Sequence, residues 1–100
     1  MSEDWEIRAS QLLEVARSLK GELREAFIYL VDNVSVGDLR AAIDLRRRGI
    51  RDPAAVLEEL VNMGLAERGD ECYNLPAPLR KLIAERGIGA IERVLGSGPG

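Results

Sequence analysis

Residues 52–75, with the sequence DPAAVLEELVNMGLAERGDECYNL, contain both ends of a helix and the turn of a hairpin. Asp52 followed by Pro53 is a strong helix start, because aspartate caps free backbone N–H groups and proline is favoured at the first helical position. Gly64 predicts the end of this helix, since glycine readily adopts the left-handed conformation that closes a helix. The apolar spacing between these signals predicts a helix over 53–63.

The residues after this helix have the pattern of a β-hairpin. Two short segments, 65–68 and 71–75, flank Gly69 and Asp70. A two-residue loop with glycine first suits a type II′ turn, whose first central residue needs a positive φ. The sequence therefore predicts a hairpin that turns at Gly69-Asp70.

A short strand and a short helix are expected before the helix at 53–63. Ser35 and Val36 indicate a short extended stretch, and Gly49 lies just beyond the end of the helix that follows. The apolar side of that helix is expected at Leu39, Ala42, Ile43 and Leu45. These residues should face the core.

The N-terminal part of the chain has a heptad pattern. Apolar or small residues fall at Trp5, Ala9, Leu12, Ala16, Leu19, Leu23, Ala26 and Leu30. Steps of four and three residues indicate a helical seam. Either one helix runs over about 4–32, or two helices meet near Lys20 and Gly21. The break is slightly favoured because glycine inside a helix costs about 1 kcal/mol relative to alanine, although the unbroken seam argues against it.

Helical segments are also expected at the C-terminal end. Pro78 is a favoured helix start, and Gly87 and Gly89 break the helix. The apolar residues expected to pack are Leu79, Leu82 and Ile83 in the first piece, and Ile88, Ile91, Val94 and Leu95 in the second.

The expected order over residues 23–75 is helix, short strand, helix, turn, helix and two-stranded hairpin. This order resembles the winged helix-turn-helix superfamily, as does a third helix ending in LEELVNMGLAER before a hairpin ending in YNL. The resemblance implies a mainly α fold with a small β-hairpin and additional N- and C-terminal helices. It implies one domain over 1–95, with its core at 23–75, flanking helices at 4–20 and 78–95, and a disordered tail at 96–100.

The composition argues against several classes of function. The chain has 100 residues, no histidine and one cysteine, Cys72. The absence of histidine removes the commonest general base and metal ligand, and one cysteine forms neither an internal disulfide nor a multi-cysteine zinc site. We therefore expect no enzyme, no metal site and no cofactor.

Charge and hydropathy indicate a soluble globular protein. The net charge is −3, with 46% hydrophobic and 31% charged residues, so no general attraction to nucleic acid or anionic membrane is expected. Apolar runs are far shorter than the roughly 20 residues that span a bilayer, and the acidic start MSEDWEIR is unlike a signal peptide. We expect a cytoplasmic protein without membrane contact. Few thermolabile residues beside abundant charge favour a thermostable one.

In the winged-helix superfamily, the third helix commonly enters the major groove of DNA and the wing touches the backbone or the minor groove. The resemblance therefore maps DNA contacts onto the outward side of 53–63. That side is expected to present Ala54, Ala55, Glu58, Glu59 and Asn62. Asn62 is a common reader of adenine, but the two glutamates repel phosphate, so the chain departs from a typical DNA-binding member here.

Four arginines ahead of the third helix, together with Arg40, are the main basic feature. One interpretation is a phosphate clamp, and the other is that cations at a helix C-terminus complement the helix dipole, each contributing about 0.3–1 kcal/mol. Asp44 and Asp52 lie close enough to neutralise part of the cluster. The candidate DNA-binding residues are Arg40, Arg46, Arg47, Arg48, Arg51, Ala54, Ala55, Asn62 and Arg68.

Two hypotheses for function follow. The first is a winged-helix transcription regulator that binds duplex DNA mainly through phosphates, as a homodimer. The second is a winged-helix module that binds a protein partner in a larger assembly without touching DNA. The arginines favour the first hypothesis by a narrow margin, while the acidic third helix favours the second. The homodimer is expected to form through Trp5, Leu12, Leu19, Ile88, Ile91 and Leu95, although Trp5 equally suits a core position.

Overall fold

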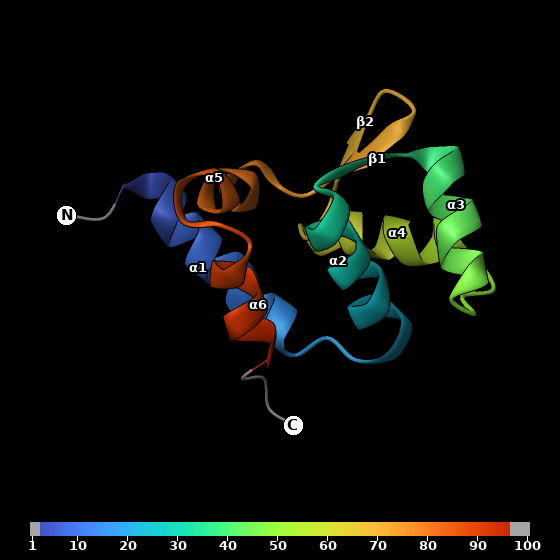
Figure 1. The fold of residues 1–100 in the computed structure, drawn as a ribbon, viewed down its shortest axis with the longest axis horizontal. Helices are drawn as coiled ribbons and strands as arrows, with labels where there is room; N and C mark the ends of the chain where they lie inside the picture. Colours follow the sequence, from blue (N-terminus) through green and yellow to red (C-terminus); the bar gives the residue numbers. More distant parts are fainter. Residues whose placement is uncertain (1–2, 97–100) are drawn as a thin grey trace.

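A computed structural model describes residues 3–96, which fold into helices and a small antiparallel sheet (Figure 1). The elements are α1 (Asp4–Arg17), α2 (Gly21–Asn33), β1 (Ser35–Gly37), α3 (Asp38–Arg47), α4 (Pro53–Asn62), β2 (Glu67–Gly69), β3 (Cys72–Asn74), α5 (Ala77–Arg86) and α6 (Gly89–Gly96). The strands form one sheet in the order β1-β3-β2. The expectation of a mainly helical fold with a small β element is confirmed, and β1 adds a third strand to the hairpin.

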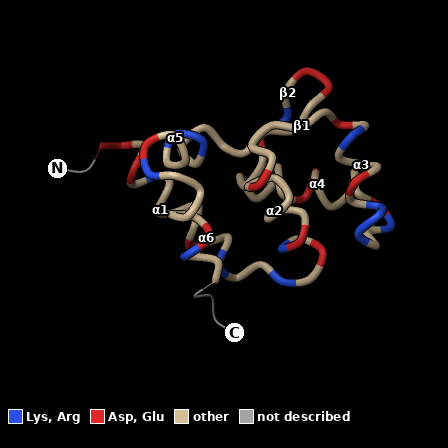
Figure 2. Tube along the Cα trace, in the orientation of Figure 1, with Lys and Arg blue, Asp and Glu red and all other residues tan. Residues whose placement is uncertain are grey.

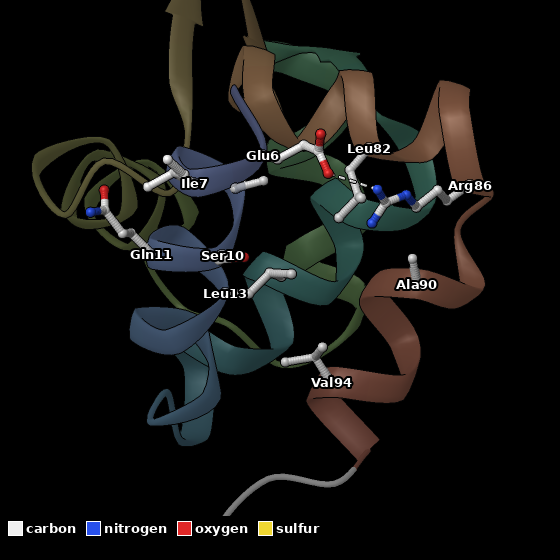
Figure 3. Close-up of a pocket in the computed structure, with 10 residues that line it drawn as sticks. Glu6, Ile7, Ser10, Gln11, Leu13, Leu82, Arg86, Ala90 and Val94 are labelled. Carbon is white, nitrogen blue, oxygen red and sulfur yellow. Dashed lines mark hydrogen bonds and ion pairs between the residues drawn. The ribbon is translucent and has the colours of Figure 1, made fainter. Parts of the chain in front are cut away.

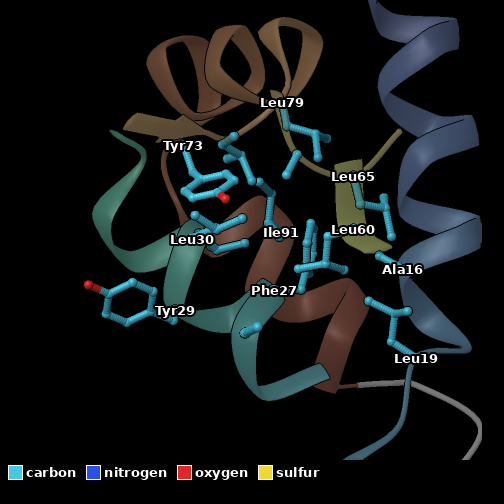
Figure 4. Close-up of a cluster of buried hydrophobic side chains, with 14 of the residues drawn as sticks. Ala16, Leu19, Phe27, Tyr29, Leu30, Leu60, Leu65, Tyr73, Leu79 and Ile91 are labelled. Atoms are coloured by element: carbon cyan, nitrogen blue, oxygen red, sulfur yellow. The ribbon is translucent and has the colours of Figure 1, made fainter. Parts of the chain in front are cut away.

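The helices gather in two groups around one continuous core. α1 packs on α5 and α6, while α2 packs on α4, and α3 packs on α4 and β1. Figure 1 shows α1, α5 and α6 at one end of the molecule and α3 at the other, with α2 and α4 between them. Figure 4 shows where the groups meet, with Phe27 and Leu30 of α2 close to Leu60 of α4 and Ile91 of α6.

The predicted break in the N-terminal helix is confirmed. α1 ends at Arg17, with Ser18 as its C-cap, and α2 begins at Gly21. Gly21, with a φ of +61°, is the first residue of α2, and Ser18 is the C-cap of α1. The residues of the heptad pattern still pack together on both sides of the break, because both helices and Leu19 between them contribute to the same core.

The helix predicted over 53–63 is α4, and its ends are formed by the residues that the sequence indicated. The Asp52 side chain accepts a hydrogen bond from the backbone N–H of Ala55 at 3.2 Å, and Pro53 occupies the first turn. At the other end Gly64 has a φ of +79°, and the Leu65 N–H donates to the carbonyl of Leu60 at 2.9 Å. This closing bond is typical of a helix that ends on a left-handed glycine.

The hairpin turns one residue later than predicted. Gly69 pairs with Cys72, so the loop is formed by Asp70 and Glu71, and Glu71 has a φ of +57°. The predicted type II′ turn at Gly69-Asp70 is therefore wrong. A Cβ at position 69 would lie 2.6 Å from the Cys72 Sγ and 3.0 Å from the Asn74 Nδ2, so a larger residue there would require these two side chains to move.

The buried side of α3 also differs from the prediction. The structure buries Ala41 and Leu45 completely, whereas Leu39 is 78% exposed and Ile43 is 51% exposed. The expectation that Leu39 and Ile43 face the core is wrong. Ala41 and Leu45 lie four residues apart and share one face of the helix, and the small alanine lets the helix approach its neighbours closely.

The C-terminal helices form close to the expected positions. α5 begins at Ala77, after Pro76, one residue earlier than the predicted proline start. Gly96 ends α6, and the rest of the predicted disordered tail lies outside the described residues. Within residues 3–96, no helix combines the length and apolar character needed to cross a membrane.

We predict that Gly64→Ala lowers the free energy of unfolding by about 1 kcal/mol, because a Cβ disfavours the left-handed conformation at this position. Urea unfolding measures the change. Gly96→Ala is the matched control, since a Cβ there has no atom within 4 Å and the residue lies in a helix. Equal stability of the Gly64→Ala variant and the parent would contradict the assigned helix end.

Candidate functional site

The outward side of α3 combines arginines with large apolar residues. We call this surface the α3 face, and its exposed members are Leu39, Arg40, Ile43, Arg46 and Arg47. Figure 2 shows basic positions gathered at the C-terminal end of α3 and in the loop after it, at the end of the molecule away from α1, α5 and α6. Sequence reasoning identified the arginines but placed the two apolar side chains in the core.

The predicted phosphate clamp is partly neutralised by neighbouring carboxylates. Arg40 forms an ion pair with Asp44 at 3.3 Å, and Arg48 forms one with Glu25 at 3.2 Å. The Arg48 guanidinium also lies 5.1 Å from the centre of the Tyr29 ring. Among the described residues, Arg46, Arg47 and Arg51 are exposed and make no ion pair or side-chain hydrogen bond. These three arginines remain available to a partner.

A buried tyrosine holds α3 against α2. The Tyr29 hydroxyl donates a hydrogen bond to Asp44 Oδ2 at 2.6 Å. Burial, together with this hydrogen bond to a carboxylate, raises the pKa of Tyr29 to about 12. The same hydrogen bond, and the positive charge of Arg40, lower the pKa of Asp44. Asp44 is thus engaged by Tyr29 and Arg40, and the charge of Arg47 also acts on it, but within residues 3–96 neither Arg46 nor Arg47 forms an ion pair with it.

The outward side of α4 has the composition that the sequence indicated. Ala54, Ala55, Glu59 and Asn62 are exposed, and they form an acidic to neutral surface. Glu58 is half-buried and turns towards the hairpin. This surface has little to attract phosphate, because it presents carboxylates and no base.

Arg68 of the hairpin is used within the protein. Its guanidinium forms an ion pair with Glu58 and donates a hydrogen bond to the Tyr73 hydroxyl at 3.2 Å. The Tyr73 hydroxyl in turn donates to Glu58 Oε1 at 3.3 Å. These contacts join the hairpin to α4, and they engage one of the predicted DNA-binding residues.

The residues predicted for dimerisation lie mostly in the core of the single chain. Leu12, Leu19, Ile91 and Leu95 are between 0% and 7% exposed, so they offer almost no surface to a second copy. Trp5 and Ile88 are half-buried against the same core. The apolar stripes at the two ends of the chain cover each other, because α1 packs on α5 and α6. Homodimerisation remains a prediction that these residues no longer support.

A groove of about 580 Å³ lies among α1, α5 and α6 (Figure 3). The Arg86 guanidinium and the Glu6 carboxylate form an ion pair at 2.7 Å beside Leu82 at one side of it. Its remaining lining mixes small, polar and apolar side chains, including Ser10, Gln11, Leu13, Ala90 and Val94. The groove was not foreseen from sequence, because it depends on how helices distant in the chain pack. In residues 3–96, no cluster of metal-ligating side chains occurs.

We predict that the Tyr29 phenol ionises near pH 12, and that its contribution to stability is present below pH 10 and lost as pH rises towards 12. A spectrophotometric titration in the Tyr73→Phe protein isolates this group, with circular dichroism at each pH to follow the fold. Asp44→Asn should lower the pKa of Tyr29 only in part, because burial is the larger cause. Ionisation near pH 10 in the folded protein would contradict the burial and hydrogen bonding of Tyr29.

Comparison with curated proteins finds no match to this chain. A family model described as PolB1 Binding Protein 2 matches residues 20–81. The match runs from the residue before α2 into α5, so it includes α3, α4 and the whole sheet, and leaves α1 and α6 outside. Because the match covers more than half of the sequence, the chain belongs to the PolB1 Binding Protein 2 family.

Proposed function

We propose that this chain is a protein-interaction module that binds a PolB1 protein. The observation that carries the proposal is the family match over residues 20–81, since the family is described by its binding to PolB1. The matched segment contains the α3 face and the hairpin, and therefore the exposed basic and apolar side chains of this half of the molecule. The family match favours the protein-binding hypothesis over the transcription regulator.

Surface chemistry supports a protein partner. The chain has a net charge of −3, and the outward side of α4 is acidic to neutral. Exposed Leu39 and Ile43 give the α3 face an apolar part that a phosphate backbone would not use. Contact with another protein can bury such side chains, and their burial contributes to affinity.

The winged-helix assignment is part of the same proposal. The order α2, β1, α3, α4, β2 and β3 is the order on which the resemblance rests, and it supports placing this segment in the winged helix-turn-helix superfamily. One fold of this kind serves many functions, so the fold is compatible with protein binding as well as with DNA binding. We further propose that the chain acts by binding and not by catalysis.

DNA binding through the arginines is the second candidate function. Arg46, Arg47 and Arg51 support it, because they are exposed and make no ion pair within residues 3–96. A duplex held in this way would be bound through phosphates with little sequence preference, since α4 presents few side chains that read base edges.

The proposed function predicts a stable complex with PolB1 from the same organism. Titration calorimetry of the two purified proteins should give saturable binding, with a Kd at or below about 1 µM, the range of many specific protein complexes. Sedimentation of the mixture should show one complex heavier than either protein. The absence of a complex at tens of micromolar of both proteins would disprove the proposed function.

For the second candidate, duplex binding should weaken steeply with salt, and each phosphate contact should add about 0.9 to the slope of log affinity against log salt. Arg46→Ala with Arg47→Ala should flatten this slope by up to about two units if both side chains contact phosphate. Fluorescence anisotropy with a labelled duplex measures it. No duplex binding by the parent protein at low salt would remove DNA as a ligand.

A further inference from the structure

Leu39 and Ile43 form an exposed apolar pair on α3. They lie four residues apart on one helix, so both project from the same side, with 78% and 51% exposure. The fold does not need them, because Ala41 and Leu45 supply the buried side of this helix. Because these two side chains stay exposed, their burial contributes little to the stability of the fold. Adjacent exposed apolar side chains are typical of a binding surface.

Two arginines lie next to this apolar pair on α3. Arg46 and Arg47 follow Ile43 by three and four residues, which places them on the same side of α3, one turn further along. Neither makes an ion pair within residues 3–96, and the Asp44 carboxylate is engaged by Tyr29 and Arg40. The α3 face is therefore locally basic on a protein whose net charge is negative.

We infer that the α3 face is the docking surface for an acidic, amphipathic segment of PolB1. Apolar side chains of that segment would cover Leu39 and Ile43, and its carboxylates would pair with Arg46 and Arg47. An apolar centre with charged residues at its margin is the usual arrangement of a protein interface. This inference rests on the proposed function and adds to it the surface used and the chemistry of the segment bound.

A nucleic acid fits this surface less well than an acidic protein segment does. Phosphates would pair with the arginines, but they would lie against Leu39 and Ile43 without burying them in apolar contact. An acidic protein segment satisfies both kinds of side chain at once. The two ligands therefore differ in one measurable respect, because only the protein segment depends on the apolar pair.

The first experiment replaces the apolar pair and measures binding to purified PolB1. Leu39→Ser with Ile43→Ser should weaken binding at least about tenfold, since exposed apolar anchors at the centre of an interface carry much of its affinity. Ile7→Ser with Val15→Ser is the matched control, because these α1 side chains are also large, apolar and exposed, at 50% and 40%. The control should bind as the parent does, and thermal unfolding should show that both variants are folded.

The second experiment reverses charge on the same surface. Arg46→Glu with Arg47→Glu should weaken PolB1 binding, chiefly by slowing association, and the loss should shrink at high salt. Arg8→Glu with Lys20→Glu changes the net charge by the same amount at exposed positions outside the α3 face. A local contact predicts a much larger loss for the first pair than for the second.

Three results would overturn the inference, and they differ in what they say of the proposed function. If the parent protein binds PolB1 and the Leu39→Ser, Ile43→Ser variant binds equally well, docking occurs elsewhere and the proposed function stands. If the parent binds duplex DNA but not PolB1, and only the arginine reversals abolish that binding, the surface is a nucleic-acid contact. If the parent binds neither, the proposed function and the inference fail together.

Discussion

The burial of the apolar side of α2 is the constraint on which the rest of the structure depends. Phe27 and Leu30 are fully buried and lie where the two groups of helices meet (Figure 4). Full burial of a large apolar side chain contributes about 1.5–3 kcal/mol, so these residues hold α4 on one side and the terminal helices on the other. α1 and α6 depend on this contact as well, because their seam residues, including Ile91, join the same core.

Because the apolar sides of α1, α2 and α6 are buried in the core, only certain surfaces remain exposed to a partner. The terminal helices cover each other and leave a groove that carries an ion pair between Glu6 and Arg86. α3, at the opposite end, buries only a narrow strip of small and aliphatic residues. Its other side remains exposed, with an apolar pair and with arginines that make no ion pair to any residue in 3–96, in the segment that the family match covers.

The distribution of charge over α3, α4 and the hairpin fits a protein ligand better than DNA. A surface for DNA would be expected to be basic on α4 and on the hairpin, and here Glu58 and Arg68 neutralise each other between these two elements. The exposed arginines that form no ion pair inside the described part of the chain lie instead on α3, which also exposes Leu39 and Ile43, and in the loop after it. A protein ligand with acidic and apolar side chains matches this combination, because it can pair with the charges and bury the apolar residues.

Local signals in the sequence were sufficient for the order of the elements and for several of their ends. Asp52 with Pro53 and Gly64 marked α4, and Gly21 marked the break between α1 and α2, because capping and backbone freedom depend on neighbouring residues. The arginine cluster was equally visible, since consecutive charges need no tertiary contact to be recognised.

Only the tertiary structure decided which side of each element is buried and which residues are available. α3 is too short for its apolar pattern to define one face, so packing of Ala41 and Leu45 against the core selected the exposure of Leu39 and Ile43. The hairpin turn lies one residue later than predicted because β3 pairs with both β1 and β2, and the pairing of Gly69 with Cys72 leaves Asp70 and Glu71 as the loop. The apolar side of α1 packs on α5 and α6 of its own chain, because segments at least sixty residues apart in sequence lie together in the fold.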